Sequence, residues 1–127
     1  MYGIAIANKD FKNPLDQIKE KFESYKGTNR IQFFANISAD YIIFCNAVIN
    51  YDFANIRIYL RAALRLNGEY YVTIVNGGNK VYDKICTLNE LFEVMDDFVH
   101  TISSIAYKIG VMEFMDYWRN LSAVDNL

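Results

Sequence analysis

The pattern of apolar and polar residues changes its period twice along the chain. It starts at helical spacing, with four apolar residues on one stripe: Leu15, Ile18, Phe22 and Tyr25. Asn13 is a good helix cap, Pro14 suits the first helical position, and Gly27 is a common residue after a helix end. The sequence therefore predicts a helix over residues 13–26.

Between residues 30 and 86, β-branched and aromatic runs are separated by turn residues, as in an antiparallel meander. The runs predict five strands, at about 31–37, 41–49, 54–66, 69–76 and 80–86. The second run shows little alternation of polar and apolar residues, which indicates a central strand covered on both faces. A further short strand at 2–7 is expected to join the sheet edge.

The strongest turn signal in this region is Asn67-Gly68, because both residue types accept positive φ in a two-residue hairpin turn. Such a turn sets Arg65 opposite Tyr70. This register places Tyr70 on the same face of the sheet as Arg65, because residues directly opposite each other share a face.

After the last predicted strand the period becomes helical again. Thr87 and Glu90 match the T-x-x-E capping box of a helix start, and Gly110 marks the helix end. One apolar stripe runs between them: Leu88, Leu91, Phe92, Met95, Phe98, Val99, Ile102, Ile105 and Ile109. A shorter helix at about 111–121 repeats the pattern. The prediction is a single α+β domain over 1–127, with an N-terminal helix, a five-stranded, mostly antiparallel meander sheet, a long C-terminal helix and a short one.

Length and composition narrow the class of protein. With 127 residues, 53% of them hydrophobic and 16% aromatic, the chain can bury a single core, which excludes disordered and repetitive proteins. The longest apolar run is too short for a membrane helix, and the N-terminus does not match a secretory signal. We therefore expect a cytoplasmic protein, and its bias toward Asn, Ile, Lys, Tyr and Phe is typical of an AT-rich prokaryotic or phage genome.

Candidate catalytic and metal-binding residues are few. Asp96 and His100 lie one helical turn apart and could serve a metal or a general base, but a metal site needs more ligands than these two. Cys45 and Cys86 lack zinc or redox spacing, so two buried thiols are expected. The sequence therefore predicts no catalytic residues, no metal and no cofactor, and it favours a solvated, salt-bridging face for the long helix.

The most suggestive segment is the third predicted strand and the hairpin after it. This segment gathers five side chains on one face: Arg57, Tyr59, Arg61, Arg65 and Tyr70. Arg and Tyr are frequent anchors at protein interfaces, and a guanidinium is planar, permanently charged and able to bond carboxylates or phosphates in pairs. These five residues are the predicted partner-binding site.

Two alternatives to this interpretation stay open. Arg57, Arg61 and Arg65 also recur at helical spacing, so residues 56–66 could form a helix, although the strand alternation is the more complete match. The three Arg could equally serve only to keep an exposed sheet face in solution. Whether residues 56–66 form a strand or a helix, the three Arg share one face.

The leading functional hypothesis is a non-enzymatic protein-binding module, such as a small stoichiometric inhibitor of the immunity, antitoxin or phage anti-defence type. The net charge of −2 gives no overall attraction to phosphate, so a single-stranded nucleic-acid binder using the same face is the second hypothesis. A small-ligand-binding or enzymatic α+β domain and a secretion-chaperone-like homodimer are further alternatives. We expect a protein partner, no membrane, and a monomer or homodimer.

Overall fold

The computed structural model of the chain describes residues 14–50, 55–105 and 115–121. Its elements are α2 (Pro14–Glu23), β1 (Ile31–Ser38), β2 (Ile42–Asn50), β3 (Asn55–Leu64), β4 (Tyr70–Asn76), β5 (Asn79–Cys86) and α3 (Leu88–Ile105), followed by a C-terminal helix at 115–121. The predicted order of helix, five strands, long helix and short helix is confirmed. The predicted strand at 2–7 and the predicted helical residues 106–114 lie outside the described residues.

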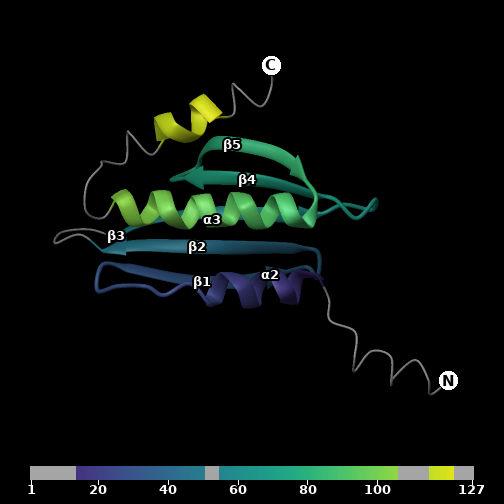
Figure 1. The fold of residues 1–127 in the computed structure, drawn as a ribbon, viewed down its shortest axis with the longest axis horizontal. Helices are drawn as coiled ribbons and strands as arrows, with labels where there is room; N and C mark the ends of the chain where they lie inside the picture. The colour runs from purple at the N-terminus through teal and green to yellow at the C-terminus, as the bar shows by residue number, and fades with distance from the viewer. Residues whose placement is uncertain (1–13, 51–54, 106–114, 122–127) are drawn as a thin grey trace.

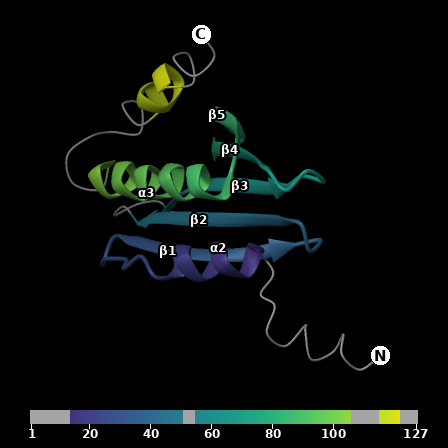
Figure 2. The same cartoon turned by 45° about the vertical axis from the view of Figure 1, so that its right-hand side comes forward.

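The five strands form one antiparallel sheet in the order β1-β2-β3-β4-β5. Neighbours in the sheet are neighbours in the chain, so the predicted meander is confirmed, and residues 55–64 form a strand rather than a helix. Helices α2 and α3 lie on the same side of the sheet, α2 beside β1 and α3 across its middle (Figure 1, Figure 2). We call this side the covered face and the opposite side the open face.

The core lies between the covered face and the two helices. Phe22 of α2 is fully buried and meets the ring of Phe33 in β1 at 5.7 Å between centroids and that of Phe98 in α3 at 6.4 Å. Burying an apolar side chain of this size contributes about 1.5–3 kcal/mol. The helices therefore bury the apolar stripes that the sequence predicts, and the fully buried members are Leu15, Ile18, Phe22, Leu91, Met95, Phe98 and Ile102.

The start of α3 follows from local chemistry. The backbone N–H of Thr87 donates to Oε1 of Glu90 at 2.9 Å, and the backbone N–H of Glu90 donates to Oγ1 of Thr87 at 3.2 Å. The predicted capping box is confirmed. Helix α2 ends at Glu23, earlier than predicted, and Gly27 lies in the loop after it, where a Cβ would collide with the carbonyl oxygen of Ile31.

The C-terminal helix packs against α3 and β5. Trp118 is fully buried, as its place in the apolar stripe predicts. Its ring meets Tyr82 of β5 at 5.0 Å between centroids, and its Nε1 donates to Oγ1 of Thr101 in α3 at 3.3 Å. An indole that is both buried and hydrogen-bonded fixes this helix at the β5 end of the molecule.

The hairpin between β3 and β4 is one residue longer than predicted. The N–H of Arg65 donates to the carbonyl oxygen of Glu69 at 2.8 Å, and the N–H of Gly68 donates to the carbonyl oxygen of Arg65 at 3.0 Å. The connection is therefore the three residues 66–68, and Gly68 adopts a φ of 85°. A tight turn closed by a left-handed glycine is a common three-residue hairpin.

This extra residue changes the face on which β4 presents its side chains. Leu64 pairs with Tyr70, so the predicted pairing of Arg65 with Tyr70 is wrong. A one-residue slip moves every side chain of a strand to the opposite face. Tyr70 is consequently 2% exposed on the covered face. Glu69 lies opposite Arg65, and Tyr71 lies on the open face opposite Ala63.

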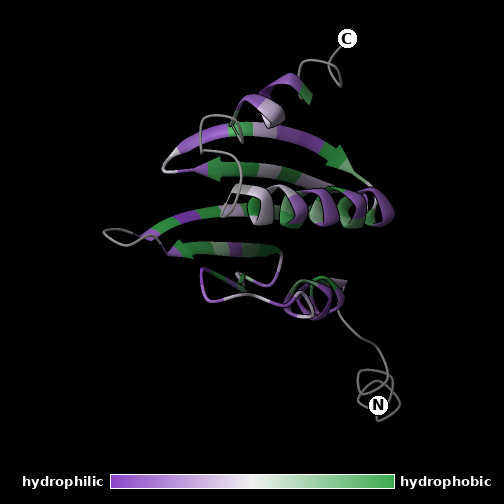
Figure 3. Ribbon diagram, turned by 60° about the vertical axis from the view of Figure 1, so that its left-hand side comes forward, coloured by the Kyte–Doolittle hydropathy of each residue, from purple (hydrophilic) through white to green (hydrophobic). Residues whose placement is uncertain are grey.

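The expectation that β2 is covered on both faces is wrong, although β2 is an interior strand between β1 and β3, as expected. The ribbon of β2 is apolar over most of its length (Figure 3), but only the Cys45 side is fully buried against the covered face, whereas Phe44 and Val48 are half-buried on the open face. The run lacks alternation because apolar side chains also occupy much of the open face.

Two backbone irregularities occur at the sheet margins. The turn from β1 to β2 holds Ala39 at a φ of 55° and Asp40 at 63°, in the left-handed region that costs energy for residues other than glycine. The β4–β5 register shifts between Ile74 and Val75, which is a β-bulge beside the last strand of the sheet.

Candidate functional site

Three of the five predicted site residues lie together on the open face. Arg57, Tyr59 and Arg61 alternate along β3, the middle strand, and none of the described helices lies over them (Figure 2). Tyr70 does not join them, because it is buried on the covered face. Arg65 follows the end of β3 and is exposed in the hairpin.

A buried amide holds Arg57 in place. Asn46 of β2 is 0% exposed although it lies on the open face. Its Oδ1 accepts hydrogen bonds from Nε of Arg57 at 2.8 Å and from Nη2 at 2.5 Å. Its Nδ2 donates to the backbone oxygens of Phe34 and Phe44 and to Oδ1 of Asn36, at 3.0–3.3 Å. Because Asn46 is satisfied on every side, it fixes the direction in which Arg57 points.

Aromatic rings surround this Asn46–Arg57 pair. The guanidinium carbon of Arg57 lies 5.7 Å from the centroid of the Tyr59 ring, within the range of a cation–π contact. Phe44 meets Tyr59 at 5.6 Å between centroids with an interplanar angle of 68°. These two contacts fix the Tyr59 ring. On the neighbouring strand Phe34 pairs with Asn46 and remains 40% exposed.

The side chain of Arg61 makes no ion pair or hydrogen bond within the described part of the chain. Its neighbour across the strands is Thr73, and Asp83 lies one strand further along the same row. Asp83 accepts hydrogen bonds from the Tyr71 hydroxyl at 2.9 Å and from Nζ of Lys80 at 3.0 Å. These bonds lower the pKa of the Asp83 carboxyl. Asp83, the nearest acidic residue in the row of Arg61, therefore already has hydrogen-bond partners.

The open face is locally positive in a chain whose net charge is −2. Among the described strand residues (31–50, 55–64 and 70–86, without the turns between strands), Asp83 has the one acidic side chain. Lys80 forms an ion pair with it and neutralises its charge. Arg57 and Arg61 have no acidic partner in that set. Exposed or half-buried apolar residues surround them: Phe34, Phe44, Val48, Tyr59, Tyr71 and Ile85.

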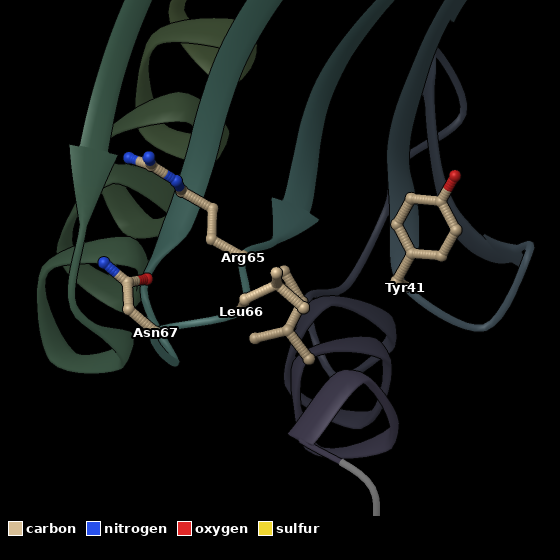
Figure 4. A pocket seen from close by; sticks show the side chains of 5 residues that line it. Tyr41, Arg65, Leu66 and Asn67 are labelled. Carbon is tan, nitrogen blue, oxygen red and sulfur yellow. The ribbon is translucent and has the colours of Figure 1, made fainter.

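A separate hollow of about 730 Å³ lies where β3 ends. It is lined by Tyr41, Leu64, Arg65, Leu66 and Asn67. Leu66 lies on the side toward Tyr41, whereas Arg65 and Asn67 extend away from Tyr41 (Figure 4). The structure thus associates Arg65 with the hairpin hollow, and the surface between Leu66 and Tyr41 is apolar.

The acidic residues of α3 connect the helices. Asp96 accepts a hydrogen bond from the Tyr25 hydroxyl and pairs with Nζ of Lys21 at 3.3 Å, which joins α2 to α3. Asp97 accepts a hydrogen bond from the Tyr117 hydroxyl at 2.6 Å, which joins the C-terminal helix to α3. Burial and this bond raise the pKa of Tyr117 to about 12. Asp96 therefore lies in a salt-bridging helix face, as predicted.

Both thiols are buried, as predicted, and neither forms a disulfide. Burial raises the pKa of the Cys45 thiol, because it disfavours the thiolate. Among the described residues, no cluster of three or more His, Cys, Asp or Glu side chains could hold a metal ion. No described helix is both long enough and apolar enough to cross a membrane.

Sequence reasoning missed Asn46, Phe44 and Phe34. The available signal is a single amide inside the apolar run of the second predicted strand. That Asn46 meets Arg57 follows only from the pairing of β2 with β3, which the amino-acid pattern does not fix.

Comparison with known proteins gives no match: no family model matches the chain, and none of the curated proteins or solved structures does either. The arrangement of side chains on the open face is therefore the basis for a functional conclusion.

Proposed function

We propose that the protein is a non-enzymatic module that binds a partner protein on the open face of its sheet. The observation that carries this proposal is the position of Arg57 beside Tyr59 on the middle strand, where the fully buried Asn46 of β2 holds Arg57. Arg and Tyr are among the residues that most often carry binding energy at interfaces. A side chain already held in one orientation loses less conformational entropy when it binds.

The surroundings of this cluster support the same proposal. An interface core is depleted in charge and enriched in aromatic residues and Arg. The open face matches that composition, with Phe34 at 40% and Ile85 at 47% exposure and a few central cations. A stoichiometric inhibitor, of the immunity, antitoxin or phage anti-defence type, is the form of this proposal we favour, because such a protein acts by occupying its partner's surface.

Binding of single-stranded nucleic acid to the same face has less support. Stacking of bases requires aromatic rings with an unoccupied face and a groove that follows many phosphates. The Tyr59 ring already contacts Arg57 and Phe44. The salt-dependent binding of a single-stranded oligothymidylate measures this alternative directly.

The proposal is tested by affinity capture from the organism that encodes the protein. The bait is the wild type, the double variant Arg57→Glu plus Arg61→Glu, or the control Arg119→Glu, whose exposed residue lies on the C-terminal helix. We expect a partner in one-to-one stoichiometry that the wild type and the control retain and that the double variant loses. Circular dichroism of all three baits verifies that they are folded. Equal capture by the double variant, or no partner at all, would contradict the proposal.

A further inference from the structure

Resting on the proposed function, we infer that the partner presents carboxylates to the open face, one to Arg61 and a second to Arg57. The two cations stand on the same face of β3, four residues apart. At about 3.3 Å per strand residue their Cα atoms are separated by about 13 Å. An extended acidic segment with carboxylates four residues apart spans the same distance.

The state of Arg61 is the first reason for this inference. Its side chain has no ion pair or hydrogen bond with any residue that the structure describes, and Asp83, in the same row, is held by Lys80 and Tyr71. A guanidinium that is half-buried among β3 neighbours has given up some hydration without gaining an anion. A carboxylate supplied by a partner compensates for the lost hydration, because it can form two parallel hydrogen bonds with the guanidinium.

The second reason is the direction of Arg57. Oδ1 of Asn46 accepts hydrogen bonds from Nε and Nη2 of Arg57. Asn46 is held in turn by hydrogen bonds from its Nδ2 to the backbone oxygens of Phe34 and Phe44 and to the side chain of Asn36. The remaining N–H groups of this exposed guanidinium are available for a second acceptor. Asn46 is thus a positioning residue: it orients Arg57 for an anion and is itself fully buried.

The charge pattern disfavours a second copy of this chain as the occupant. Because β3 is the middle of five strands, stacking two open faces centre to centre brings Arg57 and Arg61 of one copy close to those of the other. Like charges at the centre of an interface oppose association. A different protein with an acidic surface removes this repulsion and complements both cations.

The charge pattern also favours carboxylates over the phosphates of a nucleic acid. Binding through phosphates depends on neutralising many of them, whereas the described strands of this face offer two cations without an acidic partner, in a chain of net charge −2. A short acidic peptide needs no more than these two, and its apolar side chains can contact Phe34 and Phe44.

The experiment is selection of a displayed random linear peptide library on the immobilised protein. Selection on the wild type should enrich peptides with Asp or Glu spaced about four residues apart, together with apolar residues. Against one selected peptide, Arg61→Gln and Arg57→Gln should each weaken binding by about 10- to 100-fold, because each removes a hydrogen bond to a charged group. Arg119→Gln, the matched control, should leave the affinity unchanged.

The outcomes separate this inference from the proposed function. Selected peptides that bind the open face but carry no acidic residues would overturn the inference and leave the protein-binding role intact. Peptides whose affinity does not change in Arg57→Gln, Arg61→Gln or Phe34→Ala would overturn both. Salt-dependent binding of an oligothymidylate that is tighter than that of any selected peptide, and is lost in Arg61→Gln, would replace the protein partner by a nucleic acid.

Discussion

The two faces of the sheet bury their residues by different means. Cys45 and Asn46 are neighbours on β2 and are both 0% exposed. Cys45 packs in the apolar core under the helices, whereas the buried amide of Asn46 is compensated by hydrogen bonds to Arg57 and to strand β1. Apolar packing contributes most of the folding free energy, so substitutions on the covered face should cost more stability than substitutions on the open face. Four predictions test this difference, in order of decreasing effect.

The first prediction compares neighbours on β3. Leu60 is fully buried on the covered face, so Leu60→Ala should lower the free energy of unfolding by about 3 kcal/mol, through lost burial and the cavity left behind. Arg61→Ala, on the open face, should change it by less than about 0.5 kcal/mol. Urea unfolding followed by circular dichroism measures both. Similar losses for the two variants would show that the open face is part of the stabilising core.

The second prediction concerns the polar centre of the open face. Asn46→Ala removes donors and acceptors that satisfy Arg57 and the backbone oxygens of Phe34 and Phe44, so we expect a loss of about 2 kcal/mol. Arg57→Ala should cost less, because its guanidinium is exposed and only Asn46 loses partners. Chemical denaturation of both single variants and the double variant gives the coupling between them. Strictly additive losses would mean that Asn46 does not hold Arg57 in solution.

The third prediction concerns the turns that decide which face a side chain occupies. Gly68 has a φ of 85° and open space around it, so Gly68→Ala introduces backbone strain without a clash and should cost about 1 kcal/mol. Ala39, at a φ of 55°, is the matched opposite case, and Ala39→Gly should stabilise the protein by about 0.5 kcal/mol. Thermal unfolding midpoints should move in opposite directions, and shifts of the same sign would contradict the assigned turn geometries.

The smallest expected effect is a pH dependence on the open face. Hydrogen bonds from Lys80 and Tyr71 lower the pKa of Asp83 below its usual 3.8. The stability they supply is therefore fully present above pH 3.8 and is lost as the pH falls through the lower folded value. Asp83→Asn should flatten this acid limb only slightly, because the pair is partly exposed. Unfolding curves at several acidic pH values compare the variant with the wild type, and an unchanged limb would contradict the assignment.

The sequence predicts the order of elements because helical and strand periods are local properties. The stripe of α2 and the alternation of β3 follow from residues a few positions apart, and both are confirmed. The predicted face of Tyr70 is wrong because Leu66 belongs to the turn. Leu66 is apolar and continues the strand alternation in the sequence, yet it is fully exposed in the structure. A single residue of loop length, to which the pattern is insensitive, moves Tyr70 into the core.

The candidate site was partly predictable for the same reason. Arg57, Tyr59 and Arg61 share a face because they alternate on one strand. Asn46 could not be assigned to them, because its bond to Arg57 crosses between strands and depends on register. Local pattern therefore identifies the cations, and only tertiary structure identifies the group that orients one of them.

The bulge between β4 and β5 has a consequence for self-association. The bulge makes β5, one of the two edge strands, depart from regular pairing with β4, and Lys80 adds an exposed charge to β5. Both features oppose the addition of another strand at that margin, which is how many sheets avoid polymerising into extended aggregates. Because strand addition at the β5 edge is opposed, a partner binds more favourably to a face of the sheet than to this edge.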